Sequence, residues 1–478
     1  MAVDNSSEDR MREILAKQKA AHIRDGIPSA EKRIEWLDKS IDLLVTHSDA
    51  LNDAMAEDFG HRSRDQSGLT DIGGSITAMK HSKKHVRQWM RPEKRKVAFP
   101  LNMLGSKARI DFQPKGSIGV ISPWNFPVNL TFTPLANIFA AGNRAMIKPS
   151  EFTEATSALM QKLIAEYYDE EEVAVITGGP DIGAAFTSMP FDHMVFTGAT
   201  SVAKHVMRAA AENLVPLTLE LGGKSPVVLG ESADIEKAAK RIMAGKTLNA
   251  GQICLAPDYA FVPSGKTKEF VEAAQGAVET MFPTGLKDND DYTSVVNQRH
   301  YDRLNGYLED AREKGAEVVE INPADESFAQ QPHHKMAPHI VIDPTDEMTV
   351  MQEEIFGPIL PIKTYSDTKD AVGYINGKPR PLGLYYFGEN ASERDYVLNN
   401  TTSGGVTVND VVYHVAQEDL PFGGAGPSGM GSYHGHDGFL EFSHKKAIYT
   451  QTGSEMLAMI RPPYGKQYRK QVEGQIKR

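Results

Sequence analysis

The chain of 478 residues contains a single cysteine, Cys254, in a short apolar stretch at residues 251–257 that is bounded by glycine and proline. A lone thiol cannot close an intramolecular disulfide, so Cys254 is an inert buried side chain, a metal ligand without sulfur partners, or a nucleophile. Cysteine attack on a carbonyl also needs a donor for the oxyanion and, if the covalent intermediate is hydrolysed, a base for water. A nucleophilic role therefore requires two partner groups elsewhere in the chain.

Asn125 and Glu220 are the candidate partners. Asn125 lies between Trp124 and Phe126 with a proline beyond each, which makes it a neutral hydrogen-bond donor in a stiff loop. Glu220 lies in an apolar, strand-like run that is followed by two glycines and Lys224. It is either paired with Lys224 or held for chemistry, and burial would raise its pKa toward the range of a useful base.

A glycine turn between a strand and a helix is a candidate cofactor site. No G-x-G-x-x-G fingerprint follows the first predicted strands. Instead, Gly198 and Thr200 separate a predicted strand at 193–196 from a predicted helix at 204–212, where helix N-terminal N–H groups can meet a pyrophosphate. Thr200 could equally serve only to cap that helix.

A second strand end carries charged groups that suit a sugar. Lys148 and Glu151 follow the predicted strand at 145–147 and could hydrogen-bond ribose hydroxyls. The structural alternative for this turn is a capping box that begins at Ser150.

The elements that position these residues alternate between short apolar strands and helical stretches. Strands are predicted at 118–121, 145–147, 173–176 and 193–196, and each ends in a polar or glycine-rich turn. Strands spaced by helices imply right-handed βαβ units and a parallel sheet with ligand sites at the strands' C-terminal ends. A second stretch at 222–423 repeats the alternation, so the predicted fold class is α/β.

Two further segments differ from this pattern. Apolar residues recur at three- and four-residue steps through 7–59, which predicts a helical opening. Residues 108–112 alternate as an exposed strand does, within a proline-flanked segment at 92–114, so we expect an excursion away from the main core.

Composition excludes several classes of partner. The net charge of −11 argues against a nucleic-acid partner, and no apolar run approaches the ~18 residues of a membrane span. The charged N-terminus and lone thiol indicate the reducing cytoplasm. The basic runs at 83–95 and 461–478 are interpreted as solvated faces. Histidines match no metal-site spacing, so no metal is expected; they cluster at His333, His334, His434, His436 and His444.

Seven motifs, taken in order, resemble the signature motifs of the aldehyde dehydrogenase superfamily, and the resemblance covers residues 116–442. They are PWNFP at 123–127, KPSE at 148–151, FTG at 196–198, ELGGK at 220–224, GQIC at 251–254, EEIFGP at 353–358 and PFGG at 421–424. CLAPDY at 254–259 and GPSGMG at 426–431 resemble the class 3 branch, with its fatty aldehyde and coniferyl aldehyde dehydrogenases. RPPYG at 461–465 is most similar to the coniferyl aldehyde enzymes.

The resemblance implies a mechanism in which each role falls on a matching position. Cys254 would attack the aldehyde, while the Asn125 amide and the Cys254 backbone N–H would hold the oxyanion. After hydride transfer to the nicotinamide, Glu220 would activate the water that hydrolyses the thioester to a carboxylic acid.

The resemblance also implies a bound NAD, with NADP possible. Lys148 and Glu151 would hold the adenosine ribose, and Glu354 and Phe356 the nicotinamide ribose and ring. Glu151 should repel a 2′-phosphate and favour NAD, although Lys148 can offset this. Ala203 departs from the glycine common in the family, and its methyl could alter cofactor placement. The implied cofactor contacts are Ile121, Ser122, Trp124, Lys148, Ser150, Glu151, Gly178, Gly198, Thr200, Leu221, Gly222, Glu354 and Phe356.

The implied architecture has three parts and a tail. A Rossmann-type NAD(P)-binding domain would comprise 1–97 and 113–221, a catalytic domain 222–423, an oligomerisation arm 98–112 and 424–450, and a C-terminal tail 451–478. An exposed strand that pairs across a homodimer satisfies its edge, so a soluble homodimer is expected.

Substrate identity stays open between classes. By resemblance, the first choice is an aromatic propenal such as coniferyl aldehyde, oxidised to ferulate, and the second is a medium- or long-chain aliphatic aldehyde. Two other possibilities are a CoA-acylating dehydrogenase, against which the Glu220 motif argues, and a catalytically silent binding or structural homologue. The intact set of Cys254, Glu220 and Asn125 argues against the silent homologue.

Overall fold

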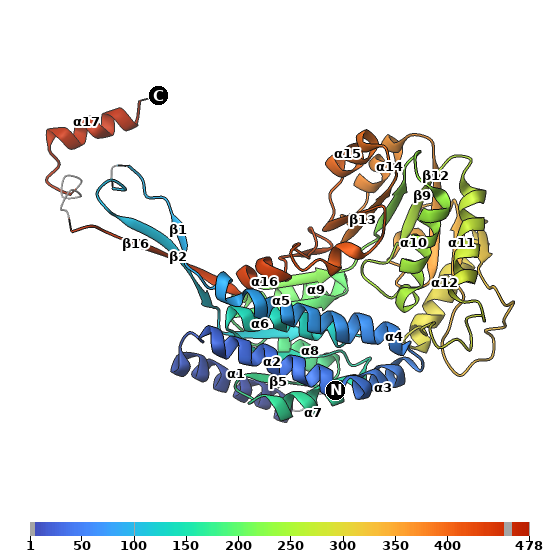
Figure 1. Cartoon of the computed structure of the whole chain (residues 1–478), viewed down its shortest axis with the longest axis horizontal. Coiled ribbons are helices and arrows are strands. Elements are labelled where there is room, and N and C mark those ends of the chain that lie inside the picture. The colour runs from blue at the N-terminus through green and yellow to red at the C-terminus, as the bar shows by residue number, and fades with distance from the viewer. Residues whose placement is uncertain (1–4, 100, 454–460, 478) are drawn as a thin grey trace. The chain divides into compact units, whose positions relative to one another are not determined.

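The computed structural model describes residues 5–99, 101–453 and 461–477 (Figure 1). The chain forms two compact units. Unit 1 comprises Met1–Trp89 and Pro114–Ser443, and unit 2 comprises Met90–Gln113 and His444–Arg478. Each unit has its own sheet structure, so the two are described separately.

Unit 1 opens with helices, in agreement with the helical pattern at 7–59. Leu37 and Leu44, two residues of the predicted apolar face, are buried, and Ser29 accepts a hydrogen bond from the Lys32 N–H at the start of one helix. The opening elements are α1 (Asn5–Asp25), α2 (Ala30–Thr46), α3 (Ser48–Phe59), α4 (Arg64–Ser67), the π-helical turn η1 (Gly68–Gly73) and α5 (Gly74–Trp89).

Six of the described strands form the first sheet, in the order β15-β7-β6-β3-β4-β5, with only β15 antiparallel to its neighbour. The four strands predicted between residues 118 and 196 are all present and parallel, as expected for βαβ units. The strands are β3 (Ser117–Ile121), β4 (Arg144–Lys148), β5 (Val173–Val175), β6 (His193–Gly198), β7 (Leu217–Leu221) and β15 (Gly429–Met430). The helices between and after them are α6 (Asn129–Ala141), α7 (Glu154–Tyr167), α8 (Pro180–Thr187), α9 (Thr200–Ala211) and α16 (Gly435–Glu441).

Seven described strands form the second sheet of unit 1, in the order β10-β11-β12-β9-β8-β13-β14, with only β10 antiparallel. The strands are β8 (Pro226–Leu229), β9 (Tyr259–Pro263), β10 (Glu317–Glu320), β11 (His339–Ile342), β12 (Ile359–Tyr365), β13 (Gly383–Phe387) and β14 (Gly405–Val408). The intervening elements are α10 (Ile235–Thr247), the 3-10 turn η2 (Leu248–Gly251), α11 (Thr267–Met281), α12 (Gln298–Glu313), α13 (Thr349–Gln352), α14 (Thr368–Asn376), α15 (Ala391–Asn400) and the 3-10 turn η3 (Tyr413–Ala416).

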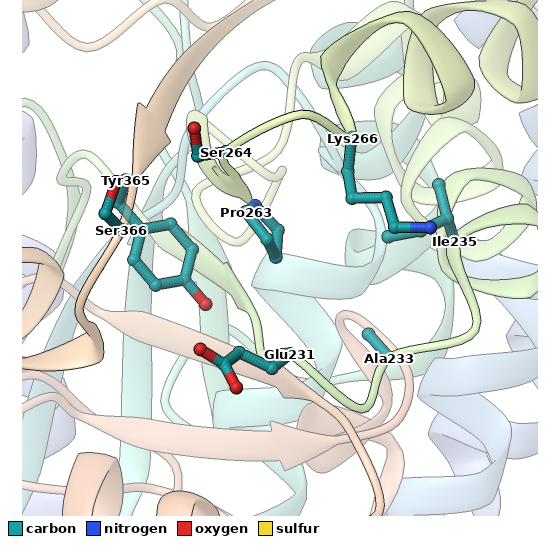
Figure 2. A pocket seen from close by; sticks show the side chains of 8 residues that line it. All are labelled: Glu231, Ala233, Ile235, Pro263, Ser264, Lys266, Tyr365 and Ser366. Carbon is teal, nitrogen blue, oxygen red and sulfur yellow. The ribbon is translucent and has the colours of Figure 1, made fainter.

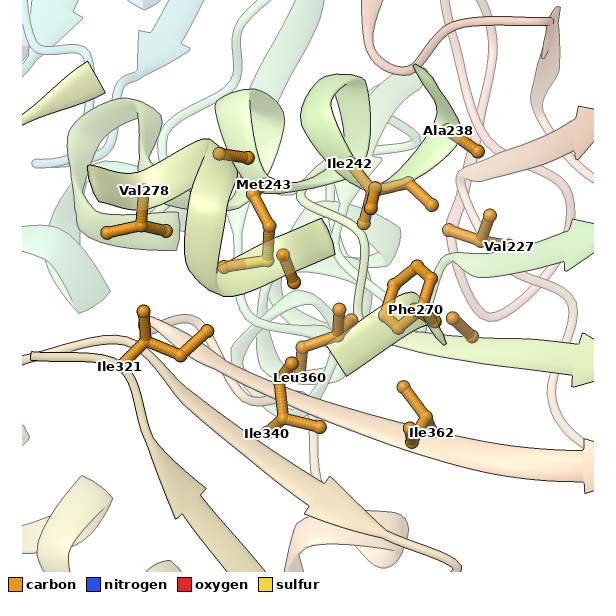
Figure 3. Packing of buried hydrophobic residues seen from close by; sticks show 14 of the residues in the cluster. Val227, Ala238, Ile242, Met243, Phe270, Val278, Ile321, Ile340, Leu360 and Ile362 are labelled. Atoms are coloured by element: carbon orange, nitrogen blue, oxygen red, sulfur yellow. The ribbon is translucent and has the colours of Figure 1, made fainter. Parts of the chain in front are cut away.

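The second sheet is buried on both faces, which is typical of a parallel sheet. Val227 and Ile362 point into one core together with Met243 of α10 and Phe270 of α11 (Figure 3). Val228, next to Val227, belongs to the opposite core with residues of α12 and α14. Successive strand residues thus serve opposite cores, and the sheet is a rigid platform for the loops at its strand ends.

Unit 2 contains a three-stranded sheet in the order β1-β2-β16 and a terminal helix. These elements are β1 (Glu93–Arg95), β2 (Lys107–Pro114), β16 (Ser443–Thr450) and α17 (Lys466–Gln475). The strand expected at 108–112 is present as part of β2.

The predicted arm at 424–450 is divided between the units. Its first part joins unit 1, because β15 pairs with β7 through Gly429 and Glu220. Residues 424–443 thus belong to unit 1, and residues 444–450 belong to unit 2. No helix in the described part of the chain combines the length and apolar character that crossing a bilayer requires.

Candidate active site

Cys254 lies in the loop that follows η2, and this loop has an uncommon backbone. Asn249 and Ala250 have φ angles of 50° and 51°, which side chains disfavour. A Cβ at Gly251, with φ of 74°, would lie 2.3 Å from the carbonyl oxygen of Gly357. Only glycine fits there, and the loop is held against the segment that contains Glu354.

Gln252 secures this loop from inside. Its Nε2 donates to the carbonyl oxygens of Asn249 at 2.9 Å and Ser294 at 3.0 Å, and its Oε1 accepts from the Val296 N–H at 2.9 Å. Gln252 is fully buried, whereas Cys254, two residues later, keeps part of its surface exposed. The thiol is therefore presented by a fixed backbone.

Asn125 is brought to the same loop. Its side-chain Nδ2 donates to the carbonyl oxygen of Gln252 at 3.1 Å, and its own carbonyl accepts from Asn249 Nδ2 at 3.0 Å. The predicted oxyanion donor, Asn125, is thus hydrogen-bonded to Gln252, which lies two residues before the predicted nucleophile, Cys254.

An ion pair that the sequence reasoning missed holds the Asn125 loop from behind. Arg62 and Asp71 are both fully buried and pair at 2.7 Å, and Arg62 Nη1 donates to the Asn125 carbonyl at 2.7 Å. Asp71 Oδ1 accepts from the N–H groups of Val128 and Asn129. Nothing in the local sequence distinguishes Arg62 and Asp71 from surface charges. The backbone groups that they bond, at Asn125, Val128 and Asn129, lie about sixty residues away along the chain.

Glu220 is buried in β7, and neither of its carboxylate oxygens has a hydrogen-bond partner among the described residues. Burial raises its pKa well above the ordinary value, and the nearby Glu354 raises it further. The alternative pairing with Lys224 is wrong. Lys224 contacts Asp258 Oδ1 and donates to the carbonyl oxygens of Val350 and Glu353.

The thiol of Cys254 shares this environment. Burial raises its pKa well above the ordinary value, the carboxyls of Glu220 and Glu354 add to that effect, and the backbone N–H groups of Cys254 and Leu255 oppose it. The three predicted groups Cys254, Glu220 and Glu354 therefore act on one another electrostatically.

Glu354 approaches the turn after β7. A Cβ at Gly222 would lie 2.1 Å from Glu354 Oε2, so glycine is required for this approach. Burial raises the pKa of Glu354 to about 8, with Asp258 adding to the effect. Its Oε1 is buried and has no partner in the described chain. Phe356, two residues later, packs edge-on against Trp124 at 5.3 Å between ring centroids.

The remaining predicted cofactor residues gather at the C-terminal edge of the first sheet. Ile121, Lys148, Gly198 and Leu221 are the last residues of β3, β4, β6 and β7, and Lys148 Nζ donates to Glu151 Oε2 at 2.9 Å. Turns beyond these strands and β5 supply Ser122, Trp124, Ser150, Gly178 and Gly222, and Thr200 is the first residue of α9.

Both capping alternatives are wrong. Thr200 is the first residue of α9 rather than its cap, and its hydroxyl donates to the Pro427 carbonyl at 3.1 Å. Ser150 accepts from the Phe152 N–H, and α7 begins only at Glu154. Neither hydroxyl is committed to a helix terminus.

Ala203 faces the sheet. Its side chain is buried and belongs to the core between α9 and the first sheet. The extra methyl group therefore fills the interface between helix and sheet.

Two more residues near Glu220 were not predicted as site residues. The hydroxyls of Tyr433 and Thr197 are buried and have no hydrogen-bond partner in the described chain. Lys246, in the last turn of α10, is also buried without a partner there, and burial lowers its pKa to about 8. Tyr433 lies outside the seven motifs, so nothing in the sequence indicated that it belongs to the site. The sequence around Lys246 is that of an ordinary helix, so it did not indicate a buried lysine.

Other candidate features lie apart from these residues. A pocket of about 250 Å³ contains none of the predicted site residues (Figure 2). It is lined by Glu231, Ala233, Ile235, Pro263, Ser264, Lys266, Tyr365 and Ser366. Among the described residues, no three His, Cys, Asp or Glu side chains are grouped as a metal site would require.

Comparison with known proteins gives a family match over most of the chain. The aldehyde dehydrogenase family matches residues 2–448. A probable coniferyl aldehyde dehydrogenase of Caulobacter vibrioides is 61% identical over 98% of this chain and 97% of its own. A coniferyl aldehyde dehydrogenase of a Pseudomonas species is 53% identical over 94% and 93%. The substrate-bound structure of Staphylococcus aureus AldH is 34% identical with a TM-score of 0.91, over 98% of this chain and 99% of that one.

Proposed function

Because this chain belongs to the aldehyde dehydrogenase family, and is therefore an NAD(P)-dependent oxidoreductase, we propose that it oxidises aromatic propenals such as coniferyl aldehyde to carboxylic acids. The support for this substrate class is the 61% and 53% identity to relatives that carry the coniferyl aldehyde name. The product from coniferyl aldehyde would be ferulate.

In the proposed mechanism Cys254 is the nucleophile. Its sulfur attacks the aldehyde carbon, and the Asn125 amide and the Cys254 backbone N–H stabilise the oxyanion. The observation that carries this assignment is the 3.1 Å hydrogen bond from Asn125 to the Gln252 carbonyl, which ties the donor to the nucleophile loop.

NAD(P) supplies the hydride acceptor in this reaction. The chain's residues suit it, because the orphaned Oε1 of Glu354 and the Lys148–Glu151 pair offer hydrogen-bonding groups for two riboses. Glu354 and Phe356 would hold the nicotinamide end, and Lys148 and Glu151 the adenosine end. We infer a preference for NAD, since the Glu151 carboxylate repels a 2′-phosphate, with NADP also accepted.

Glu220 is the proposed base for hydrolysis. Its carboxylate takes a proton from water while the water oxygen bonds to the acyl carbon, and the C–S bond breaks to return Cys254 as a thiolate. The burial of Glu220 and its lack of a fixed partner support this role.

We also propose a homodimer joined in part through the strands of unit 2, and a cytoplasmic location. The homodimer is supported by the edge strands of the small three-stranded sheet, which can pair with another copy. The cytoplasmic location is supported by the lone thiol, which a reducing compartment protects.

A substrate panel tests the proposal. We expect kcat/KM to be higher for coniferyl aldehyde than for hexanal or dodecanal, higher with NAD than with NADP, and unchanged by CoA. Higher kcat/KM for the saturated aldehydes would contradict the substrate assignment. Cys254→Ala serves as the control, because it should abolish turnover and leave NAD affinity nearly unchanged.

A further inference from the structure

Two buried hydroxyls, those of Tyr433 and Thr197, lie in the same region of the first sheet as Glu220. Both of its carboxylate oxygens, the Tyr433 hydroxyl and the Thr197 hydroxyl are buried and unpartnered within the described chain. Buried polar atoms without partners are costly, so a group of four in one region requires an explanation.

The backbone brings Thr197 and Glu220 together. They are paired positions on the neighbouring parallel strands β6 and β7. Side chains of paired residues on adjacent strands point to the same face of a sheet, so the Thr197 hydroxyl and the Glu220 carboxyl lie on one face.

Tyr433 reaches the same place from the segment before α16. Its N–H donates to the Phe422 carbonyl at 3.2 Å, its carbonyl accepts from Asn137 Nδ2 at 2.5 Å, and its side chain is fully buried. These contacts engage its backbone N–H and carbonyl, and its hydroxyl is left to interact with side chains such as Thr197.

Electrostatics connects the tyrosine with the site. Burial raises the pKa of Tyr433 well above the ordinary value, Glu220 and Cys254 raise it further, and the Thr197 hydroxyl lowers it. Besides burial, Glu354 is the titratable group that raises the pKa of Glu220, and Glu354 is itself affected by Asp258, Lys224 and Arg303.

We propose that Tyr433 and Thr197 are positioning residues whose hydroxyls hold the Glu220 carboxylate ionised and oriented for hydrolysis of the thioester. Each hydroxyl has one proton to donate, and the carboxylate has two oxygens that accept. Thr197 can therefore donate to Glu220 directly, or to the Tyr433 hydroxyl, which in turn donates to Glu220. Either hydroxyl can act directly or through one water in this polar site. The inference rests on the proposed role of Glu220 as the base.

Tyr433→Phe and Thr197→Val remove the hydroxyls with little change in shape. With coniferyl aldehyde and NAD, we expect each variant to keep the pre-steady-state burst of NADH but to lose about 10-fold in steady-state kcat. The acid limb of the kcat–pH profile should move up by about one pH unit, because a carboxylate that loses a donor ionises less readily. Thr197→Ser should restore the wild-type profile.

Tyr292→Phe is the matched control. It removes a fully buried hydroxyl that donates to the Met336 carbonyl at 2.7 Å, so it should change neither the burst nor the pH profile. Should Tyr433→Phe not fold, as judged by thermal melting, Thr197→Val decides the question alone.

Wild-type pH profiles in both hydroxyl variants would overturn the inference. So would equal loss of burst and turnover, since the hydroxyls would then serve acylation or folding. Glu220→Gln separates this failure from failure of the proposed function. If Glu220→Gln slows hydrolysis while the hydroxyl variants do not, Tyr433 and Thr197 are excluded as positioning residues and Glu220 remains the base. Normal turnover in Glu220→Gln would instead exclude Glu220 as the base.

Discussion

The thiol of Cys254, the proposed nucleophile, is surrounded by groups that disfavour its charge. Cys254 is partly exposed, but burial and two neighbouring carboxyls keep its pKa high. A neutral thiol is a weak nucleophile and a stable one, so the resting site protects the chain's single cysteine until a neighbouring group accepts its proton.

Glu220→Gln should separate the two halves of the reaction. Gln keeps the size of the side chain but cannot accept a proton from water, so hydrolysis slows while hydride transfer proceeds. We expect a burst of reduced cofactor followed by turnover slower by about 10²-fold or more. Rapid-mixing absorbance measurements give both phases, and a normal steady-state rate would exclude Glu220 from this role.

Glu354 makes stability depend on pH. Burial raises its pKa from 4.5 to about 8, so between these values the folded chain holds a proton that the unfolded chain releases. Its contribution to stability is thus complete below about pH 4.5 and declines as the pH rises toward 8.

Glu354→Gln removes this proton and should flatten the pH dependence. Between pH 5 and pH 8 the Tm of the variant should fall less than that of the wild type, by about 2 °C. Thermal melting at both pH values measures the difference, and parallel curves for the two proteins would refute the assignment.

At the scale of elements, the turn between β7 and β8 depends on its glycine. A Cβ at Gly222 would displace the Glu354 carboxylate, which lies within 2.4 Å of it through both oxygens. We expect Gly222→Ala to lower kcat/KM for NAD by about 10²-fold, as a 1 Å misplacement can.

Gly276→Ala in α11 is the control for this substitution. A Cβ there meets nothing within 4 Å, and alanine in a helix interior stabilises by about 0.5–1 kcal/mol. Unchanged kinetics in both variants would mean that the approach of Glu354 to the turn has no role in cofactor use.

Local sequence patterns predicted the strands better than the helix ends. The strands β3, β4 and β6 are apolar runs buried on both faces, so their sequence alone marks them. The N-terminus of α7 differs because its first N–H groups, at Ala155 and Thr156, have no partner within the helix and bond to Asp58 of α3. That partner lies 97 residues away from Ala155, and no local rule identifies it.

The site shows the same division. Glycine spacing, the lone cysteine and the motif order led to the prediction of Cys254, Glu220 and Asn125, because these residues combine reactive groups with distinctive sequence surroundings. Tyr433 and Thr197 required the fold, since pairing of β6 with β7 and the segment before α16 brings them together.

At the scale of the whole molecule, unit 2 carries the prediction about assembly. Phe99 and Met103, between β1 and β2, are 76% and 77% exposed, and a pairing surface between copies would cover such side chains. Sedimentation equilibrium at micromolar concentration should give a mass of twice 52.5 kDa.

Phe99→Asp combined with Met103→Asp should shift the mass toward the monomer. Ile23→Asp is the matched control, because Ile23 is 82% exposed on α1 in unit 1. A fully active wild-type monomer under these conditions would contradict the dimer.

The single cysteine also determines how the protein reacts with oxidants such as peroxide. Peroxide converts a thiolate to a sulfenic acid, which a second thiol ordinarily traps as a disulfide before further oxidation. Cys254 has no such resolving partner in its own chain, so rescue depends on a small thiol such as glutathione reaching it. Because the chain has one thiol, a thiol-selective alkylating reagent can add at most one group per chain, and that group marks Cys254.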